Sequence, residues 1–224
     1  MSAALRRAVS FVRINPIHQE TGAEVETVLA GGARVIMLPY FRTPQEVETF
    51  VRCVDSRAQV TILLETGSAL ARVREVLAVA GIDEVMAGLN DLRIELRVGN
   101  VFEVLASPLL DCLAGETHKR GLQFSVGGIA RLDDTTLPVP ADLVLAQYPR
   151  LGATGAWLSR SFLHAPTATS DPGAAIRSIR RRLSEWDAVS PEAREAARDC
   201  LAARAREVDR GNNPQSALSL WAAR

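Results

Sequence analysis

The stretch from Val60 to Leu92 constrains the fold of this chain more than any other part of the sequence. The apolar, largely β-branched run Val60–Leu64 predicts a strand that is covered on both faces and ends at Glu65. A helical pattern follows, and Asp83–Leu89 then predicts a second buried strand, which ends at Asn90 and Asp91. The stretch therefore reads as strand, helix and strand, with an acidic residue after each strand.

The two acidic residues are candidates for a cation site. Parallel strands place their carboxyl ends at one rim, where barrels and open α/β sheets carry their chemistry, so Glu65 and Asp91 are expected to lie close together. Mg²⁺ or Mn²⁺ fits such a site, because hard cations prefer oxygen ligands and accept water or substrate oxygens in the remaining positions. Spacing alone leaves a second interpretation open, in which Glu65 caps the next helix and Asp91 belongs to an Asx turn.

Strand and helix patterns alternate along most of the chain. Further strands are predicted at 8–14, 34–38, 122–126 and 142–146, with a last short apolar segment at 155–162. Capping-box patterns begin helices at Thr21 and Thr43, and a helix from about 101 to 119 is interrupted at Ser107-Pro108. This alternation predicts a parallel sheet, and the absence of a glycine-rich phosphate motif after the first strand favours a (β/α) barrel over a nucleotide-binding fold.

Composition excludes some partners. The chain has 26 basic and 26 acidic residues, so no net charge attracts nucleic acid or an anionic membrane surface. Without a long apolar span or a signal-peptide pattern, we expect a cytoplasmic protein. The three cysteines, Cys53, Cys112 and Cys200, are far apart without metal-ligand spacing and are interpreted as reduced packing residues.

The C-terminal part has a different composition. Residues 164–172 are rich in Pro, Thr, Ser and Ala and predict a linker between a barrel domain at 1–163 and a helical extension at 173–224. Apolar residues at helical spacing and the Ser190-Pro191-Glu192 start predict two helices there. We expect this extension to pack on the barrel or on a neighbouring subunit of a homo-oligomer.

Several segments resemble the HpcH/HpaI aldolase and citrate lyase β-subunit family, which belongs to the phosphoenolpyruvate/pyruvate-binding TIM-barrel superfamily. The segments are, in order, VRINP, IMLPYF, LLETGSAL, GIDEVMAGLNDL, FSVGGIARL and YPRLGATGAWLSRSF, from roughly Ser10 to Phe162. The resemblance implies that Glu65 and Asp91 bind the divalent metal and that Arg13 holds the carbonyl of a 2-oxo acid or thioester. On the residues alone, a rim ion pair of Arg13 with Glu20 or Glu24 is the other interpretation.

The implied activity is that of a carbon–carbon lyase. It cleaves or forms a bond next to a 2-oxo acid such as pyruvate or oxaloacetate through a metal-stabilised enolate, whose developing charge Arg13 also stabilises. Asn15, Asn90, Gly127 and Gly128 are further candidate substrate contacts, because they follow predicted strands and the glycine pair leaves room for a ligand.

The resemblance also implies an incomplete barrel. Family members have two further βα units before the strand that carries Arg13, and the second of these strands ends in an acidic or histidine residue. We therefore expect a (β/α)8 barrel that is incomplete at its N-terminus, with His18, in the loop after Arg13, as the candidate replacement base. The alternative function is a non-catalytic truncated barrel or subunit that keeps the ligand pocket and serves in assembly.

Overall fold

The computed structural model describes residues 8–164 and 171–212. The chain forms two compact units, the first made of residues 1–96 and 112–126 and the second of residues 97–111 and 127–224. One parallel arrangement of strands in chain order runs through the fold, from β1 to β6. The strands are β1 (Phe11–Arg13), β2 (Val35–Leu38), β3 (Gln59–Leu64), β4 (Glu84–Ala87), β5 (Gln123–Ile129) and β6 (Gly155–Leu158).

The register of the first unit decides which side chains share a face. Arg13 pairs with Met37, Met37 with Thr61, and Thr61 with Glu84, all in parallel strands. Side chains alternate along a strand, so these residues and Glu65 lie on one face of the sheet. The other face carries fully buried residues, among them Ile36, Leu38, Ile62, Leu64, Val85 and Phe124.

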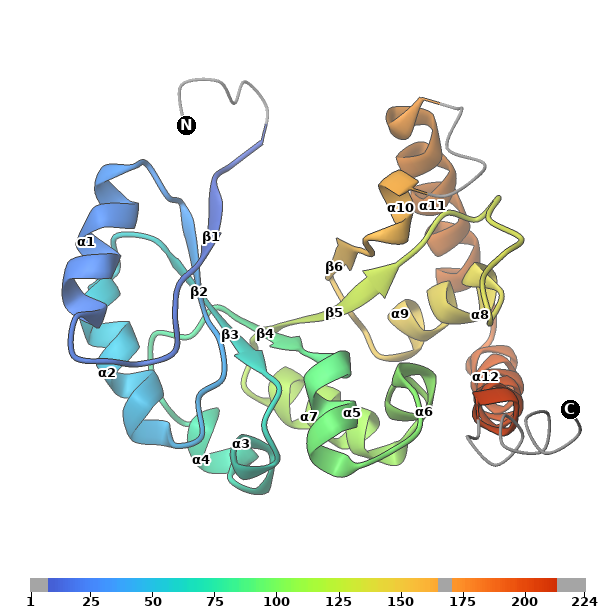
Figure 1. The fold of residues 1–224 in the computed structure, drawn as a ribbon, viewed down its shortest axis with the longest axis horizontal. Helices are drawn as coiled ribbons and strands as arrows, with labels where there is room; N and C mark the ends of the chain where they lie inside the picture. Colours follow the sequence, from blue (N-terminus) through green and yellow to red (C-terminus); the bar gives the residue numbers. More distant parts are fainter. Residues whose placement is uncertain (1–7, 165–170, 213–224) are drawn as a thin grey trace, which may run out of the picture. The chain divides into compact units, whose positions relative to one another are not determined.

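Helices of the first unit cover this second, apolar face. They are α1 (Thr21–Ala30), α2 (Pro44–Val54), α3 (Gly67–Ala71), α4 (Val73–Val76), α5 (Leu89–Leu96) and most of α7 (Pro108–Lys119). Figure 1 shows α1 and α2 side by side along the first strands. The buried residues Val47, Phe50 and Val54 of α2 follow the helical period, so one stripe of this helix faces the core.

The second unit is mainly helical. It contains β6, α6 (Val101–Leu105), α8 (Ala141–Leu145), α9 (Gln147–Arg150), α10 (Ser161–His164), α11 (Pro172–Asp187) and α12 (Pro191–Asn212). Helix α11 packs on α8 and α9, and α12 packs on α6, α8 and α9. Asp142 of α8 accepts hydrogen bonds from the Arg182 guanidinium and, at 3.0 Å, from Trp186 Nε1. The C-terminal helices are thus held to this unit by both apolar and charged contacts.

One predicted strand is a helix. Residues 142–146 lie in α8 and its C-cap rather than in a strand, so the sheet has six strands where the sequence predicted seven strand segments. Val144, Leu145 and Ala146 are buried, whereas Asp142 and Leu143 are partly exposed, and five residues are too few to show a helical or a strand period. A short apolar run of this kind is compatible with a buried strand or a buried helix, and packing decides between them.

The two predicted capping boxes, at Thr21 and Thr43, differ in outcome. Thr43 forms the predicted capping box, because its hydroxyl accepts from the Glu46 N–H and the Glu46 carboxylate accepts from the Thr43 N–H. The box predicted at Thr21 does not form. Thr21 is the first residue of α1 and its hydroxyl accepts from the His18 N–H, while the Glu24 carboxylate accepts from the Asn15 side chain.

The fold is α/β, and its chain-order parallel sheet is that of a partial TIM-like barrel. The predicted linker falls mostly on residues 165–170, which lie outside the described residues, so the domain boundaries stay a prediction.

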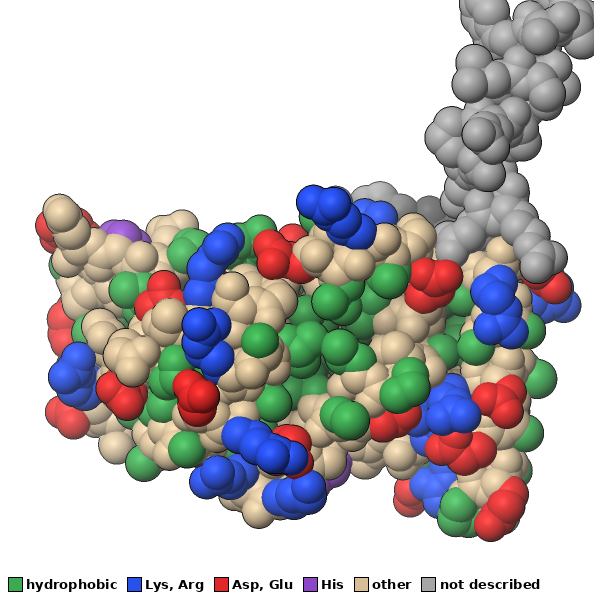
Figure 2. Space-filling model, turned by 90° about the horizontal axis from the view of Figure 1, so that it is seen from below, with side chains coloured by type: hydrophobic (Ala, Val, Ile, Leu, Met, Phe, Trp, Pro, Cys, Tyr) green, Lys and Arg blue, Asp and Glu red, His purple; other side chains and the backbone are tan. Residues whose placement is uncertain are grey.

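Among the described residues, no helix combines the length and apolar character that crossing a lipid bilayer requires. On the face drawn in Figure 2, cationic and anionic side chains are interspersed, in keeping with the neutral net charge.

Candidate functional site

Glu65 and Asp91 meet at the carboxyl ends of β3 and β4. Glu65 directly follows β3 and is only 5% exposed. Asp91 lies in the first turn of α5, because the strand predicted to continue to Leu89 ends at Ala87 and the helix begins at Leu89. Burial, and then the neighbouring charge of Asp91, raise the pKa of the Glu65 carboxyl to about 7, and the two carboxyls are close enough to share a hydrogen bond.

Arg13 and the backbone of Tyr40 complete the surroundings of this carboxylate. The positive charge of Arg13 acts on Glu65 and lowers its pKa, which opposes the effects of burial and of Asp91. The Tyr40 N–H donates to Glu65 Oε1 at 3.0 Å. Arg13 therefore lies near the carboxylate pair. Of its two alternative partners, Glu20 and Glu24, the Glu24 carboxylate accepts from Asn15 and pairs with His18.

Tyr40 reaches Glu65 through an unusual backbone conformation. Its φ angle is 55°, in the left-handed region that a bulky residue rarely adopts. The neighbouring Phe41 is fully buried, and its carbonyl accepts from the Thr66 hydroxyl at 2.7 Å. The contacts of Phe41 hold the Tyr40 backbone in this left-handed conformation. Backbone strain of this kind is typical of functional sites.

Gly88 makes room for the Glu65 side chain. A Cβ atom on Gly88 would lie 2.6 Å from Glu65 Cβ and 2.8 Å from Glu65 Oε2, both shorter than real contacts allow. The backbone of Gly88 is fixed at both ends, since its N–H donates to Leu64 and its carbonyl accepts from Leu92. The position of the Glu65 side chain therefore requires a glycine at residue 88.

This arrangement fits a divalent cation. Two carboxylates held close together in a largely buried place repel each other, and a dication would relieve that repulsion with the oxygen ligands that Mg²⁺ and Mn²⁺ prefer. Within the described residues, no group of three or more His, Cys, Asp or Glu side chains could hold a metal. A cation here would have two protein carboxylates, and Mg²⁺ commonly takes its other ligands from water and substrate.

His18 belongs to a network within its own loop. Its Nδ1 accepts from the Glu20 N–H at 3.1 Å, and its Nε2 lies 3.0 Å from Glu24 Oε2. These contacts assign the proton of the neutral ring to Nε2. In this conformation neither ring nitrogen has a lone pair available to accept a proton from a substrate.

Two of the other predicted contacts, Asn15 and Asn90, belong to the first unit. Asn15 directs its side-chain amide to Glu24 Oε1 at 2.8 Å, and Asn90 is exposed in the first turn of α5. Gly127 and Gly128 are the last glycines of β5 and belong to the second unit. Gly128 has a φ of +107°, and a Cβ on either glycine would meet no atom within 4 Å, so there is open space beside this end of β5.

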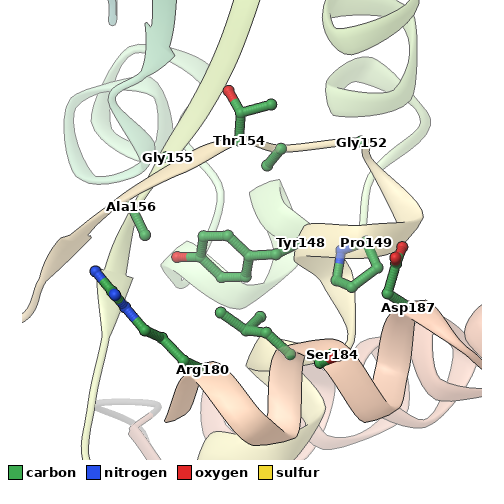
Figure 3. Close-up of a pocket in the computed structure, with 11 residues that line it drawn as sticks. Tyr148, Pro149, Gly152, Thr154, Gly155, Ala156, Arg180, Ser184 and Asp187 are labelled. Carbon is green, nitrogen blue, oxygen red and sulfur yellow. The ribbon is translucent and has the colours of Figure 1, made fainter. Parts of the chain in front are cut away.

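The second unit has a hollow of its own, of about 660 Å³, between α9, the start of β6 and α11. Figure 3 shows Tyr148 in the middle, with Arg180 and Asp187 on either side, both carried by α11. Burial raises the pKa of the Tyr148 hydroxyl, so it stays protonated. None of the residues predicted as site residues lines this hollow.

Sequence reasoning missed Tyr40 and Gly88. No sequence pattern indicates that Tyr40 is left-handed, because tyrosine disfavours that conformation and tertiary contacts impose it. The position of Gly88 in the sequence could have indicated its role. A glycine at the end of a buried strand, just before the acidic motif, often marks a close approach by another group.

Comparisons with known proteins agree with the fold and the motifs. The family model described as HpcH/HpaI aldolase/citrate lyase matches residues 2–103. Among solved structures, RipC from Yersinia pestis has a TM-score of 0.59 at 15% identity, over 77% of this chain and 75% of that one. A citrate lyase from Burkholderia xenovorans has a TM-score of 0.55 at 18% identity, over 88% and 72% of the two chains.

An HpcH/HpaI aldolase from Desulfitobacterium hafniense has a TM-score of 0.55 at 16% identity, over 81% of this chain and 73% of that one. At these identities the structural likeness concerns the fold, and no protein with a curated description matches the chain. The family match covers Arg13, Glu65, Gly88 and Asp91. The resemblance seen in the motifs is thereby confirmed for residues 2–103, which carry the carboxylate pair and match the HpcH/HpaI aldolase/citrate lyase family model.

Proposed function

We propose that this protein is a divalent-metal-dependent carbon–carbon lyase that acts on a 2-oxo acid or a related thioester. One observation carries the proposal. Two carboxylates, Glu65 and Asp91, meet at the carboxyl ends of neighbouring parallel strands, and the positive charge of Arg13 acts on the same place. The family match over residues 2–103 supports a lyase at the level of reaction class.

Each residue of the site has a role in this proposal. Glu65 and Asp91 would hold Mg²⁺ or Mn²⁺, which supplies Lewis-acid polarisation of substrate oxygens when bound. Arg13 contributes a fixed positive charge beside the carbonyl oxygen on which negative charge develops as the carbon–carbon bond breaks. The Tyr40 N–H and the close-packed Gly88 fix the orientation of the Glu65 carboxylate.

The first test measures binding of Mg²⁺ and of oxalate, without turnover, at the metal site. Isothermal titration with Mg²⁺, and with oxalate in the presence of Mg²⁺, should give binding for the wild-type chain and a loss of at least tenfold for Glu65→Gln and for Asp91→Asn. Glu48→Gln is the matched control, because Glu48 is an exposed acid on α2 outside the site, and it should bind as the wild type does.

Turnover is the second test. Release of pyruvate from oxaloacetate should require Mg²⁺ or Mn²⁺ and should fall to the protein-free background in Glu65→Gln and Asp91→Asn. Wild-type metal affinity in both variants would refute the metal site. Metal and oxalate binding without turnover of any 2-oxo acid would instead favour the alternative, a non-catalytic subunit that keeps the ligand pocket.

A further inference from the structure

The rim beside Glu65 carries an exposed aromatic ring with a cation placed over it. Tyr40 is 39% exposed although it directly follows the buried strand β2 and Pro39. The Arg42 guanidinium carbon lies 5.8 Å from the centre of the Tyr40 ring, which is within the range of a cation–π contact. The two side chains therefore form a pair, which we call the Tyr40–Arg42 pair.

The pair is linked to the carboxylate site through the backbone of Tyr40. The Tyr40 N–H donates to Glu65 Oε1 at 3.0 Å. Only two carbon atoms separate this nitrogen from the Tyr40 ring, so the ring lies within one side-chain length of the Glu65 carboxylate. A ligand held at Glu65 and longer than its chelating end is therefore within reach of the pair.

Packing and hydrogen bonds fix the backbone of residues 40–42, which carries the pair. Tyr40 is held in the left-handed conformation between Pro39 and the buried Phe41. The Arg42 N–H donates to Glu46 Oε2 at 2.6 Å, and that oxygen also accepts from the Thr43 N–H. The capping box of α2 thus fixes where the Arg42 side chain begins.

The Arg42 guanidinium keeps its hydrogen-bonding capacity. Within residues 8–164 and 171–212, no carboxylate forms an ion pair with it, and Glu46, the nearest acid in the chain, is already engaged by Arg42 and Thr43 main-chain donors. A guanidinium has five N–H donors in a planar fork that matches carboxylate and phosphate groups. An oriented cation without a protein counter-ion, beside a chelating site, is suited to an anionic ligand group.

We propose that the Tyr40–Arg42 pair selects substrates that carry a second anionic group, a carboxylate or a phosphate, at the end away from the 2-oxo acid. This inference rests on the proposed function, since it assumes that the 2-oxo acid end binds at Glu65 and Asp91. Arg42 binds the distal anion, and Tyr40 is a positioning residue that holds the guanidinium by its ring. Substrates with a neutral distal end lose this contact.

Two ligands of equal length test the pair directly. 2-Oxoglutarate and 2-oxopentanoate share the chelating end, but only the first has a distal carboxylate, and the phosphonate analogue of 2-oxoglutarate represents a phosphorylated substrate. Titrations with Mg²⁺ present should give the wild-type chain a preference of roughly three- to tenfold for the anionic ligand over 2-oxopentanoate, as expected for a partly exposed charge pair.

Variants separate this contact from the metal site. Arg42→Gln should bring the two dissociation constants together and leave oxalate affinity unchanged, because oxalate has no distal group. Tyr40→Leu should reduce the preference in part. Arg52→Gln is the matched control, since Arg52 is an exposed arginine of the neighbouring helix α2, and it should keep the wild-type preference.

The outcomes distinguish this inference from the proposed function. Oxalate binding with no preference between the two 2-oxo acids, or a preference that survives Arg42→Gln, would overturn the role of the pair and leave the metal site standing. No Mg²⁺-dependent binding of any of these ligands would overturn both. Stronger binding of the phosphonate than of the carboxylate would support the pair and identify a phosphorylated substrate.

Discussion

Replacing Gly88 with alanine should displace Glu65 and weaken metal binding. The new Cβ would lie 2.6 Å from Glu65 Cβ and 2.8 Å from Glu65 Oε2, about 1 Å inside ordinary carbon contact distance. Rotation of the carboxylate can relieve the contact with Oε2. It cannot relieve the contact with Glu65 Cβ, which is attached directly to the backbone at the end of β3.

The magnitude follows from two opposing effects. Overpacking of a fixed contact costs about 1–3 kcal/mol, and the hydrogen bonds from Gly88 to Leu64 and from Leu92 to Gly88 prevent the backbone from yielding. Alanine also restricts the unfolded chain, which contributes about 0.4–1 kcal/mol in the opposite direction. We therefore expect a net loss of about 1–2 kcal/mol, or roughly 2–8 °C in Tm for a chain of this size.

The assay combines thermal unfolding with Mg²⁺ titration. Loss of the Glu65 orientation should weaken Mg²⁺ binding by roughly 10- to 100-fold, as is typical when the support of a ligand is removed. Gly115→Ala is the control, because Gly115 lies within α7 and a Cβ there meets nothing within 4 Å. That variant should gain up to about 1 kcal/mol from helix propensity and bind Mg²⁺ normally. Wild-type Tm and Mg²⁺ affinity in Gly88→Ala would refute this reasoning.

Three further predictions concern charge, the loop histidine and the glycine pair. Because the pKa of Glu65 is raised from 4.5 to about 7, the metal-free folded protein keeps a proton that the unfolded chain releases. Its free energy of unfolding should therefore fall by about 3 kcal/mol as pH rises from 4.5 to 7, and urea titrations with saturating Mg²⁺ should remove most of this fall. His18→Gln should keep most of the oxaloacetate turnover, since both ring nitrogens are engaged within the loop, whereas a 10²–10⁴-fold loss would identify His18 as the base. Gly128→Val should destabilise the fold by about 1–3 kcal/mol in urea unfolding because φ is +107°, while Gly127→Ala should be nearly neutral; equal stabilities would contradict the strain argument.

Patterns within the sequence predicted the central strands of the sheet and some helix boundaries. Continuous apolar β-branched runs predicted β2, β3 and β4, because a strand covered on both faces requires them. The capping box at Thr43 and the interruption at Ser107-Pro108 were readable, since both depend on residues a few positions apart. The acidic residues after neighbouring parallel strands likewise predicted that Glu65 and Asp91 lie close together, because parallel strands place their carboxyl ends at one rim.

Tertiary packing decided what local pattern leaves open. The run at 142–146 is a helix although its short apolar pattern is compatible with a buried strand or a buried helix, and the packing of α11 and α12 on α8 decides between the two. Glu24 accepts from Asn15 and pairs with His18 instead of capping its own helix, since the loop after β1 brings these donors to it. Tyr40 takes a left-handed conformation that its own preference opposes, because Phe41 is anchored in the core and Glu65 accepts the Tyr40 N–H. Sequence by itself predicted the strands of the sheet, apart from the helix at 142–146, and the acidic pair. The orientation of that pair and the groups around it depend on contacts between residues distant in the chain, whose energies no local pattern records.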